Sequence, residues 1–503
     1  MSLAPRFLAI VFALLCGALP VRAAQDAALE RGTAITDPAT LRELDSGRFR
    51  LDRMLLPERS ADTPLANSAL FALPSMVPVR QAIDGEFDRY IARHQANLPK
   101  ETISVGEGFD FQLFDRALLY SQETRFVLAG IVNRMDRTYV AEANCGEIRL
   151  IYRLTRMNKA AGDAAAPPRL PMTLNLVLKA KAEGSKITCS DIANRWLAAP
   201  SGTLSAKDGP LDLIGYENID RIETNLQIAH APKSAVRDFR TDYLLKVFRY
   251  DGQARVFSEK PMENQIDRAR LLADDGLKRE FRAWLLDPVN LSAFDRGTAL
   301  IPEKFLASGA IAPTPVGFDP SELEPEFGLV QGEGAVFSEA DVVAALRKAV
   351  EGGVKLQNIR SPAGFERRLN DVTCAGCHQT RGIGGFHFPG VDWMADKPSN
   401  STVVPASPHF FGDQIRRRDI LASLRDGKAP DYSRGFASRP QLRGSAELAG
   451  TNYYDGWGAH CYVQGKPATG NDGSFRDWTC AEGLSCQVAG KISRIGMCFV
   501  RSR

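Results

Sequence analysis

The chain has 503 residues and a formal net charge of +3, with 24% charged and 44% hydrophobic residues. These proportions are typical of a globular protein, and a nearly neutral chain offers no broad basic surface for nucleic acid or for an anionic membrane. The length is sufficient for two or three domains, each with its own hydrophobic core.

Residues 1–24 have the pattern of a secretory signal peptide. Arg6 precedes an apolar run over 7–19 that is short for a transmembrane helix, and small residues around Ala23 suit a cleavage site. A retained anchor and a lipid attached at Cys16 are the alternatives. We expect a periplasmic or secreted protein without stable membrane insertion after cleavage, because no later stretch is long and apolar enough to span a bilayer.

Residues 25–330 are expected to form an α+β domain, because strand patterns are followed by helical ones. Four runs rich in Val, Ile, Leu and Tyr predict strands, over 126–132, 148–154, 172–178 and 243–248. Helical spacing predicts helices over 190–197, with Ser190 or Asp191 as its cap, and over 268–286. The proline- and glutamate-rich stretch 312–325 is the best candidate for a linker to the next region.

The densest polar cluster at a strand end in this half is Asn133-Arg134-Met135-Asp136. Strand ends are common positions for binding groups, but a hydrogen-bonded turn is the simpler interpretation. The half contains no Walker loop, no G-x-S-x-G nucleophile motif and no H-E-x-x-H helix. The sequence therefore assigns no catalytic residue here.

Eight cysteines follow the signal peptide, in three groups along the chain. An even number of cysteines in an exported protein favours disulfides. Cys145 and Cys189 stand alone in the N-terminal half and predict one bond. Residues 451–503 are expected to form a small disulfide-rich module, because a segment this short needs covalent cross-links. Its four cysteines allow three pairings, and they are Cys461, Cys480, Cys486 and Cys498.

The segment Cys374-Ala375-Gly376-Cys377-His378 has the C-x-x-C-H form of a c-type haem attachment site. Two thiols at this spacing can each add across a vinyl group of one porphyrin, and His378 can then bind the iron as proximal ligand. The motif predicts one covalent haem c. Two alternatives stay open: a redox disulfide between Cys374 and Cys377, and a zinc site completed by His378 and His387.

Residues 331–450 are expected to be mainly helical around this motif and to resemble a small c-type cytochrome domain. Ser338 predicts the cap of a helix over 339–350, a second helix over 362–372 leads into the motif, and a third covers 413–424. Arg416-Arg417-Arg418 are interpreted as the solvent-exposed face of the third helix, with a docking patch for an acidic redox partner as the alternative.

Three stretches resemble a family of uncharacterised bacterial exported proteins: 126–136, 145–152 and 170–173. Members of that family also carry a C-x-G-C-H motif near the C-terminus, followed by a Phe-x-His element, and this chain has Phe386-His387-Phe388 in that place. The resemblance covers roughly residues 120–400 and implies a shared architecture. It implies no particular reaction.

The sixth iron ligand decides what a haem could do. A methionine-ligated carrier would place its methionine some tens of residues downstream, whereas Met394 lies only sixteen residues after His378. His387, between two phenylalanines in a glycine-rich loop, is the first candidate, followed by Met394 and His409. An open iron site is the remaining possibility.

The favoured function is electron transfer through a single buried haem, with an unidentified redox partner. The first alternative is a haem enzyme of peroxidase or oxygenase type, with an open iron site and an unidentified small-molecule substrate. The absence of a second C-x-x-C-H motif argues against the di-haem enzymes of this kind. The second alternative is a disulfide-stabilised binding or structural protein without haem.

Overall fold

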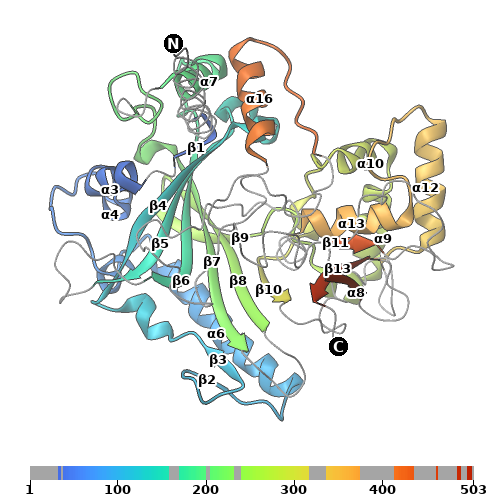
Figure 1. The fold of residues 1–503 in the computed structure, drawn as a ribbon, viewed down its shortest axis with the longest axis horizontal. Helices are drawn as coiled ribbons and strands as arrows, with labels where there is room; N and C mark the ends of the chain where they lie inside the picture. The colour runs from blue at the N-terminus through green and yellow to red at the C-terminus, as the bar shows by residue number, and fades with distance from the viewer. Residues whose placement is uncertain are drawn as a thin grey trace, which may run out of the picture.

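The computed structural model describes residues 32–35, 38–157, 169–199, 204–231, 240–315, 336–373, 413–434, 460–462, 484–488 and 495–500. Within them, a large sheet and its covering helices form one side of the molecule, and a group of short helices forms the other (Figure 1). The predicted α+β class of the N-terminal region is confirmed.

The five long strands of the sheet form a meander in which each strand runs antiparallel to the next. They are β4 Thr124–Arg134, β5 Glu147–Arg156, β6 Arg169–Lys179, β7 Ile219–Ala231 and β8 Arg240–Asp251. The four predicted strands are the central parts of β4, β5, β6 and β8. The fifth, β7, was not predicted, and it lies between two of them in the sheet.

Short strands extend the sheet on both sides. One edge is β1 Ala34–Ile35, which pairs with β4, while β9 Val256–Lys260 and β10 Gly309–Pro315 pair with β8. Two more, β2 Ile103–Ser104 and β3 Phe111–Leu113, pair in parallel, and β3 joins the end of β7. The linker expected from residue 312 is wrong at its start, because residues up to Pro315 belong to β10. Among the described strands β10 pairs only with β8, and an edge position tolerates prolines that lack an N–H donor.

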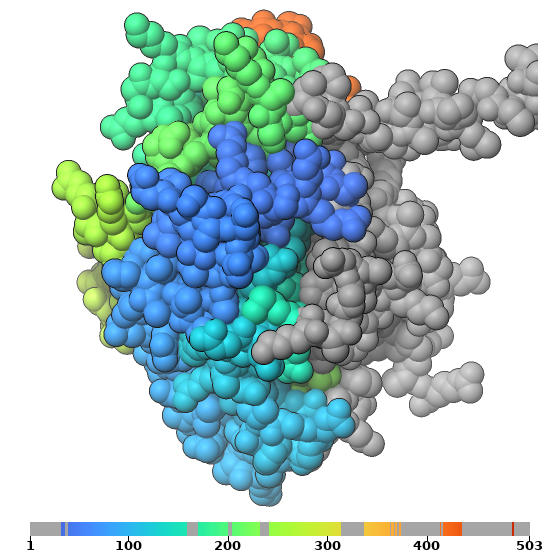
Figure 2. Space-filling view, turned by 90° about the vertical axis from the view of Figure 1, so that its left-hand side faces the viewer, coloured from blue at the N-terminus to red at the C-terminus, as the bar shows by residue number. Residues whose placement is uncertain are grey.

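Helices cover one face of the sheet and bury its apolar side chains. They are α3 Pro38–Ser46, α4 Leu51–Leu55, α5 Asn67–Leu70, α6 Val77–Asn97 and α7 Cys189–Ala198. Figure 2 shows the N-terminal helices, in blue, as a continuous layer on this side of the molecule. Every second residue of β5, from Ile148 to Leu154, points into this core.

Two expectations about helices are corrected: the residue that caps α7, and the single helix expected over 268–286. Thr188, rather than Ser190 or Asp191, is the N-cap of α7, and Asp191 closes a capping box with it. The single helix expected over 268–286 is two, α8 Arg268–Ala273 and α9 Asp275–Leu285. Asp274 ends the first and caps the second, because its carboxylate accepts the Leu277 N–H at 3.0 Å.

A second hydrophobic core is formed by α8, α9, α10 Pro288–Asp295, α12 Glu339–Glu351 and α13 Pro362–Val372. Both predicted helices of this part are confirmed, and Ser338 caps α12 as expected. The core joins Phe281 and Phe294 to Phe337 and Phe365 through ring contacts. Residues 266–306 and 336–369, which lie on opposite sides of the expected domain boundary near residue 330, therefore share one core.

Two further elements are α16 Gln414–Arg425, which confirms the third predicted helix, and a small sheet of three strands. Leu421 of α16 joins the core of the large sheet. The small sheet has the order β11 His460–Tyr462, β13 Ile495–Val500, β12 Leu484–Val488. No helix among the described residues is long and apolar enough to cross a membrane.

Candidate functional site

The residues predicted to hold haem lie outside the described part of the chain. This applies to Cys374, Cys377, His378, His387, Met394 and His409, as it does to the signal peptide and to Cys480. What the structure does describe is the protein on either side of that segment. Helix α13 ends at Val372, two residues before Cys374, and α16 begins at Gln414, two residues after residue 412.

The disulfide between Cys145 and Cys189 is confirmed, with Cα atoms 5.3 Å apart. It ties the turn before β5 to the start of α7. Cys486 is also disulfide-bonded, and it lies opposite Cys498 in the pairing of β12 and β13. Cys461 belongs to β11, opposite Gly496.

The polar group at the end of β4 is part of a buried ionic centre. Asn133 Oδ1 accepts the Met135 N–H at 2.8 Å, which is the expected hydrogen-bonded turn. Arg134 and Asp136, however, are fully buried and pair at 2.8 Å. Since a buried carboxylate needs several donors to offset its lost hydration, Asp136 requires more than a turn around it.

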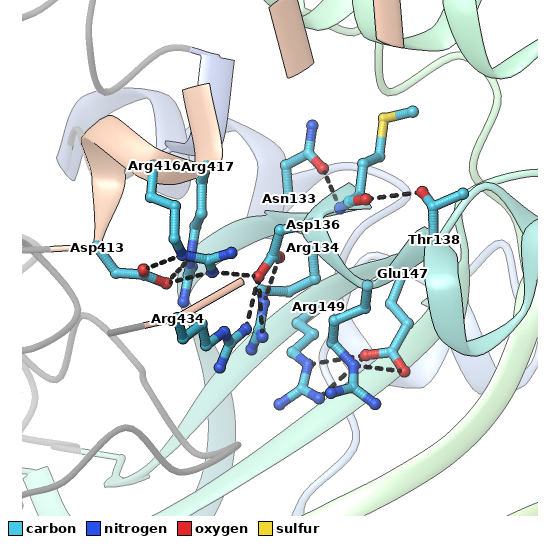
Figure 3. A network of polar contacts seen from close by, with 12 residues as sticks. Asn133, Arg134, Asp136, Thr138, Glu147, Arg149, Asp413, Arg416, Arg417 and Arg434 are labelled. Carbon is cyan, nitrogen blue, oxygen red and sulfur yellow. Dashed lines mark hydrogen bonds and ion pairs between the residues drawn. The ribbon is translucent and has the colours of Figure 1, made fainter. Parts of the chain in front are cut away.

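Asp136 receives two further arginines from the C-terminal part of the chain (Figure 3). Arg416 Nη2 and Arg434 Nη2 each donate to Asp136 Oδ2 at 2.8 Å. Asp413, at the N-cap position of α16, accepts Arg416 Nε at 2.6 Å and Arg417 Nε at 2.8 Å. We call these six residues the Asp136 cluster: Arg134, Asp136, Asp413, Arg416, Arg417 and Arg434.

The expectation that Arg416-Arg417-Arg418 form a solvent-exposed face is therefore wrong for Arg416 and Arg417, and Arg418 is only partly exposed. The side chain of Arg417 is 1% exposed and that of Arg416 is 20% exposed. The sequence carried a local signal for this, because Asp413 lies three and four residues before the two arginines, where helical side chains meet. The partner Asp136 had no such signal, since it lies 280 residues away in the sequence.

A second ionic network continues from the Asp136 cluster across the ends of the strands. Glu147 of β5 binds Arg221 of β7 at 2.8 Å and Arg149 at 3.0 Å, and it lies 3.4 Å from Arg137. Glu223 closes the network by binding Arg149 at 2.9 Å. Arg137 also pairs with Glu263. Here arginines and carboxylates alternate, so the buried charges compensate one another.

Charge in the Asp136 cluster is less even. Burial alone would raise the pKa of Asp136, but the surrounding arginines, Arg134 foremost, hold that pKa well below its usual range. Burial and then repulsion by Arg134 lower the pKa of Arg417 to about 10. Burial and then repulsion by Arg416 lower the pKa of Arg434. Among the described residues, the cluster therefore brings four guanidinium groups together around two carboxylates.

The cluster is connected to the helix that precedes the C-x-x-C-H motif. Arg368 of α13 is 1% exposed and donates from Nη2 to the carbonyl oxygens of Arg434 and Asp295, at 2.7 and 2.8 Å. Asp295 in turn accepts the backbone N–H groups of residues 357–359, which hold the loop before α13. The end of α13 is therefore fixed relative to the large sheet.

The face of the central strands that points away from the helices α3 to α7 carries buried polar side chains. Thr173 lies opposite Asn225 in the pairing of β6 and β7, with Asn175 and Gln227 two residues away on the same face. All four are at most 4% exposed. Thr173 Oγ1, Asn175 Oδ1, Gln227 Oε1 and both amide atoms of Asn225 have no hydrogen-bond partner among the described residues.

The described residues contain no group of three or more His, Cys, Asp or Glu side chains that could hold a metal ion. Comparison with protein-family models, with curated proteins and with solved structures gave no match for this chain.

Proposed function

We propose that the chain is an exported c-type haem protein that transfers electrons through one covalently bound haem. The observation that carries the proposal is the single Cys374-Ala-Gly-Cys-His378 motif behind a signal-peptide pattern. Two thiols and an imidazole at this spacing form a donor set suited to haem. When bound, haem supplies one-electron chemistry at its iron.

The surroundings of the motif support this proposal. Helix α13, which precedes Cys374, is held in place by its contacts. Arg368 donates to two carbonyl groups, and Phe365 is buried in the second core. A fixed approach suits a covalent attachment point, whose geometry must hold both thiols against one porphyrin. In the protein, His378 would bind the iron, and His387, Met394 and His409 are the candidates for the opposite side.

The test is expression of the full chain in a host with c-type maturation machinery. We expect a pyridine haemochrome spectrum and a haem that stays with the protein in denaturant. Cys374→Ala with Cys377→Ala should abolish covalent haem, whereas Cys486→Ser, which removes a cysteine of the β12 strand, should retain it. A colourless wild-type protein with a Cys374–Cys377 disulfide would overturn the proposal and favour the non-haem alternative.

A haem enzyme with an open iron site is the second candidate. It is favoured by the position of Met394, sixteen residues after His378 and too near for the usual methionine ligation. Carbon monoxide distinguishes the two haem functions. A six-coordinate electron carrier should show no rapid spectral change in its reduced form, while rapid binding would support the enzyme. Loss of the low-spin spectrum in His387→Ala would identify His387 as the sixth ligand.

A further inference from the structure

Four buried polar residues form one group on the face of the sheet that points away from α3 to α7. Alternate residues of a strand share a face, and the residues between these four, such as Leu174, belong to the core under the helices. Thr173 lies directly opposite Asn225 in the pairing of β6 and β7. We call the group the polar patch, and its members are Thr173, Asn175, Asn225 and Gln227.

The polar patch contains five side-chain atoms that are buried and have no hydrogen-bond partner among the described residues. They are acceptors on Asn175 and Gln227, a donor and an acceptor on Asn225, and the Thr173 hydroxyl oxygen. A buried polar atom without a partner destabilises the folded state. Several such atoms at adjacent positions of one face are typical of a binding site without its ligand, because function retains groups that stability alone would not.

The charged groups beside the polar patch are engaged elsewhere. Glu223, on the same face of β7, binds Arg149 at 2.9 Å and Arg221 at 2.8 Å. Arg153 lies opposite Thr173 and takes part in other interactions. The unpartnered atoms of the patch thus belong to uncharged amides and a hydroxyl. Such groups suit a neutral ligand, since an ion buried against them would lose its hydration without a counter-charge.

Apolar side chains border the polar patch on both sides. Ile151 of β5 lies on one side, and Tyr243, Leu245 and Val247 of β8 lie on the other. The spacing of strands and the rise per residue give the patch a width of about 5 Å and a length of about 13 Å. A few polar groups within an apolar border are typical of small-molecule sites, and an aromatic ring beside them suits the C–H face of a sugar ring.

We propose that the polar patch binds a neutral carbohydrate of one or two sugar units. A hydroxyl group both donates and accepts hydrogen bonds, so a row of hydroxyls can satisfy all five atoms, whichever way each amide is turned. The length of the patch is sufficient for a disaccharide. This site uses no residue of the C-x-x-C-H motif, so it goes beyond the proposed haem function and is tested separately.

The experiment is isothermal titration calorimetry of the full chain with glucose, maltose and sorbitol, and with gluconate as an anionic counterpart. Sorbitol and gluconate form a matched pair, because they share a six-carbon chain and differ in one terminal carboxylate. We expect saturable binding of the neutral probes. Gluconate should bind about tenfold more weakly than sorbitol, because its carboxylate finds no free counter-charge in the patch.

Two substitutions locate the site. Asn225→Leu and Thr173→Val remove polar atoms from the centre of the patch with little change in volume, and each should weaken binding about tenfold. Asn97→Leu, at an exposed position at the end of α6, is the matched control and should bind like the wild type. Circular dichroism checks the fold of each variant. If Asn225→Leu fails to fold, Thr173→Val carries the test.

Three results would overturn the proposal. The first is the absence of saturable binding by all three neutral probes. The second is tighter binding of gluconate than of sorbitol, which would assign the face to an anion. The third is equal binding by Asn225→Leu, Thr173→Val and the wild type, which would place the sugar elsewhere on the protein. A colourless protein that binds the sugar would overturn the proposed haem function alone.

Discussion

Many polar side chains in this protein are buried, and the free-energy cost of each depends on its hydrogen-bond partners. Asn218 is fully buried and satisfied, because its amide donates to Lys179 O at 2.9 Å and accepts the Gly215 N–H at 3.0 Å. Asn225, within β7, is equally buried but has no partner at either amide atom among the described residues. The two asparagines form a natural pair for comparison.

We expect Asn225→Leu to raise the free energy of unfolding by roughly 1–3 kcal/mol, because it removes an unsatisfied buried amide. Asn218→Leu should lower it by a similar amount, roughly 1–3 kcal/mol, because it leaves Lys179 O and the Gly215 N–H without their partner. Urea denaturation of both variants measures the difference. Destabilisation by Asn225→Leu equal to that of Asn218→Leu would show that Asn225 is satisfied in the protein.

At the scale of elements, strand alternation explains why β7 escaped prediction. Its residues Ile222, Leu226 and Ile228 face the apolar core, whereas Glu223, Asn225 and Gln227 face the other side. Polar residues at every second position are typical of a surface strand or a loop, yet both faces of β7 are buried. Runs such as 148–154 contain more leucine, isoleucine and tyrosine, and they were recognisable from the sequence.

Helix α13 contains a buried acid that should make its stability depend on pH. Glu366 is 1% exposed, and burial raises its pKa from 4.5 to about 8. A raised pKa in the folded state means that the neutral acid stabilises the fold at low pH. This contribution is fully present below the unfolded pKa and is lost as the pH rises through about 8.

We therefore expect Glu366→Gln to be more stable than the wild type at about pH 9 and similar to it at about pH 5. Each pKa unit corresponds to about 1.4 kcal/mol, so the difference between the two pH values amounts to a few kcal/mol. The measurement is denaturant unfolding at both pH values. Glu351→Gln, at an exposed position in α12, is the control and should show no such difference. A constant offset between Glu366→Gln and the wild type would contradict a raised pKa.

At the scale of the whole molecule, the Asp136 cluster ties residues 413–434 to the end of the large sheet. Arg416 and Arg417 belong to α16, Arg434 follows it, and Asp136 comes from the end of the large sheet. Next to these ion pairs, Tyr139 and Tyr432 pack with ring centroids 5.3 Å apart. Removing Asp136 should therefore weaken the attachment of residues 413–434 to the sheet.

Asp136→Asn should cost about 3–5 kcal/mol at neutral pH, because it leaves buried arginines without their carboxylate. Glu280→Gln, which breaks an exposed pair with Lys304, should cost less than about 1 kcal/mol. Since the folded pKa of Asp136 is depressed, its contribution is present above its unfolded pKa and is lost as the pH falls below about 4. Acid unfolding should consequently affect the wild type more than Asp136→Asn, and equal acid sensitivity would contradict this role.

Features that depend on neighbours along the chain could be predicted from the sequence. Four strands, the helices α7, α12, α13 and α16 and the Ser338 cap follow from periodicity and local hydrogen bonding, and only two isolated cysteines were available for the confirmed disulfide. The C-x-x-C-H motif is also local, and the haem that it indicates stays a prediction. The burial of Arg416 and Arg417, and their ion pairs with Asp136 and Asp413, could not be predicted in this way. Arginines are buried only where carboxylates compensate their charge, and the carboxylate that binds Arg416 lies 280 residues away in the sequence.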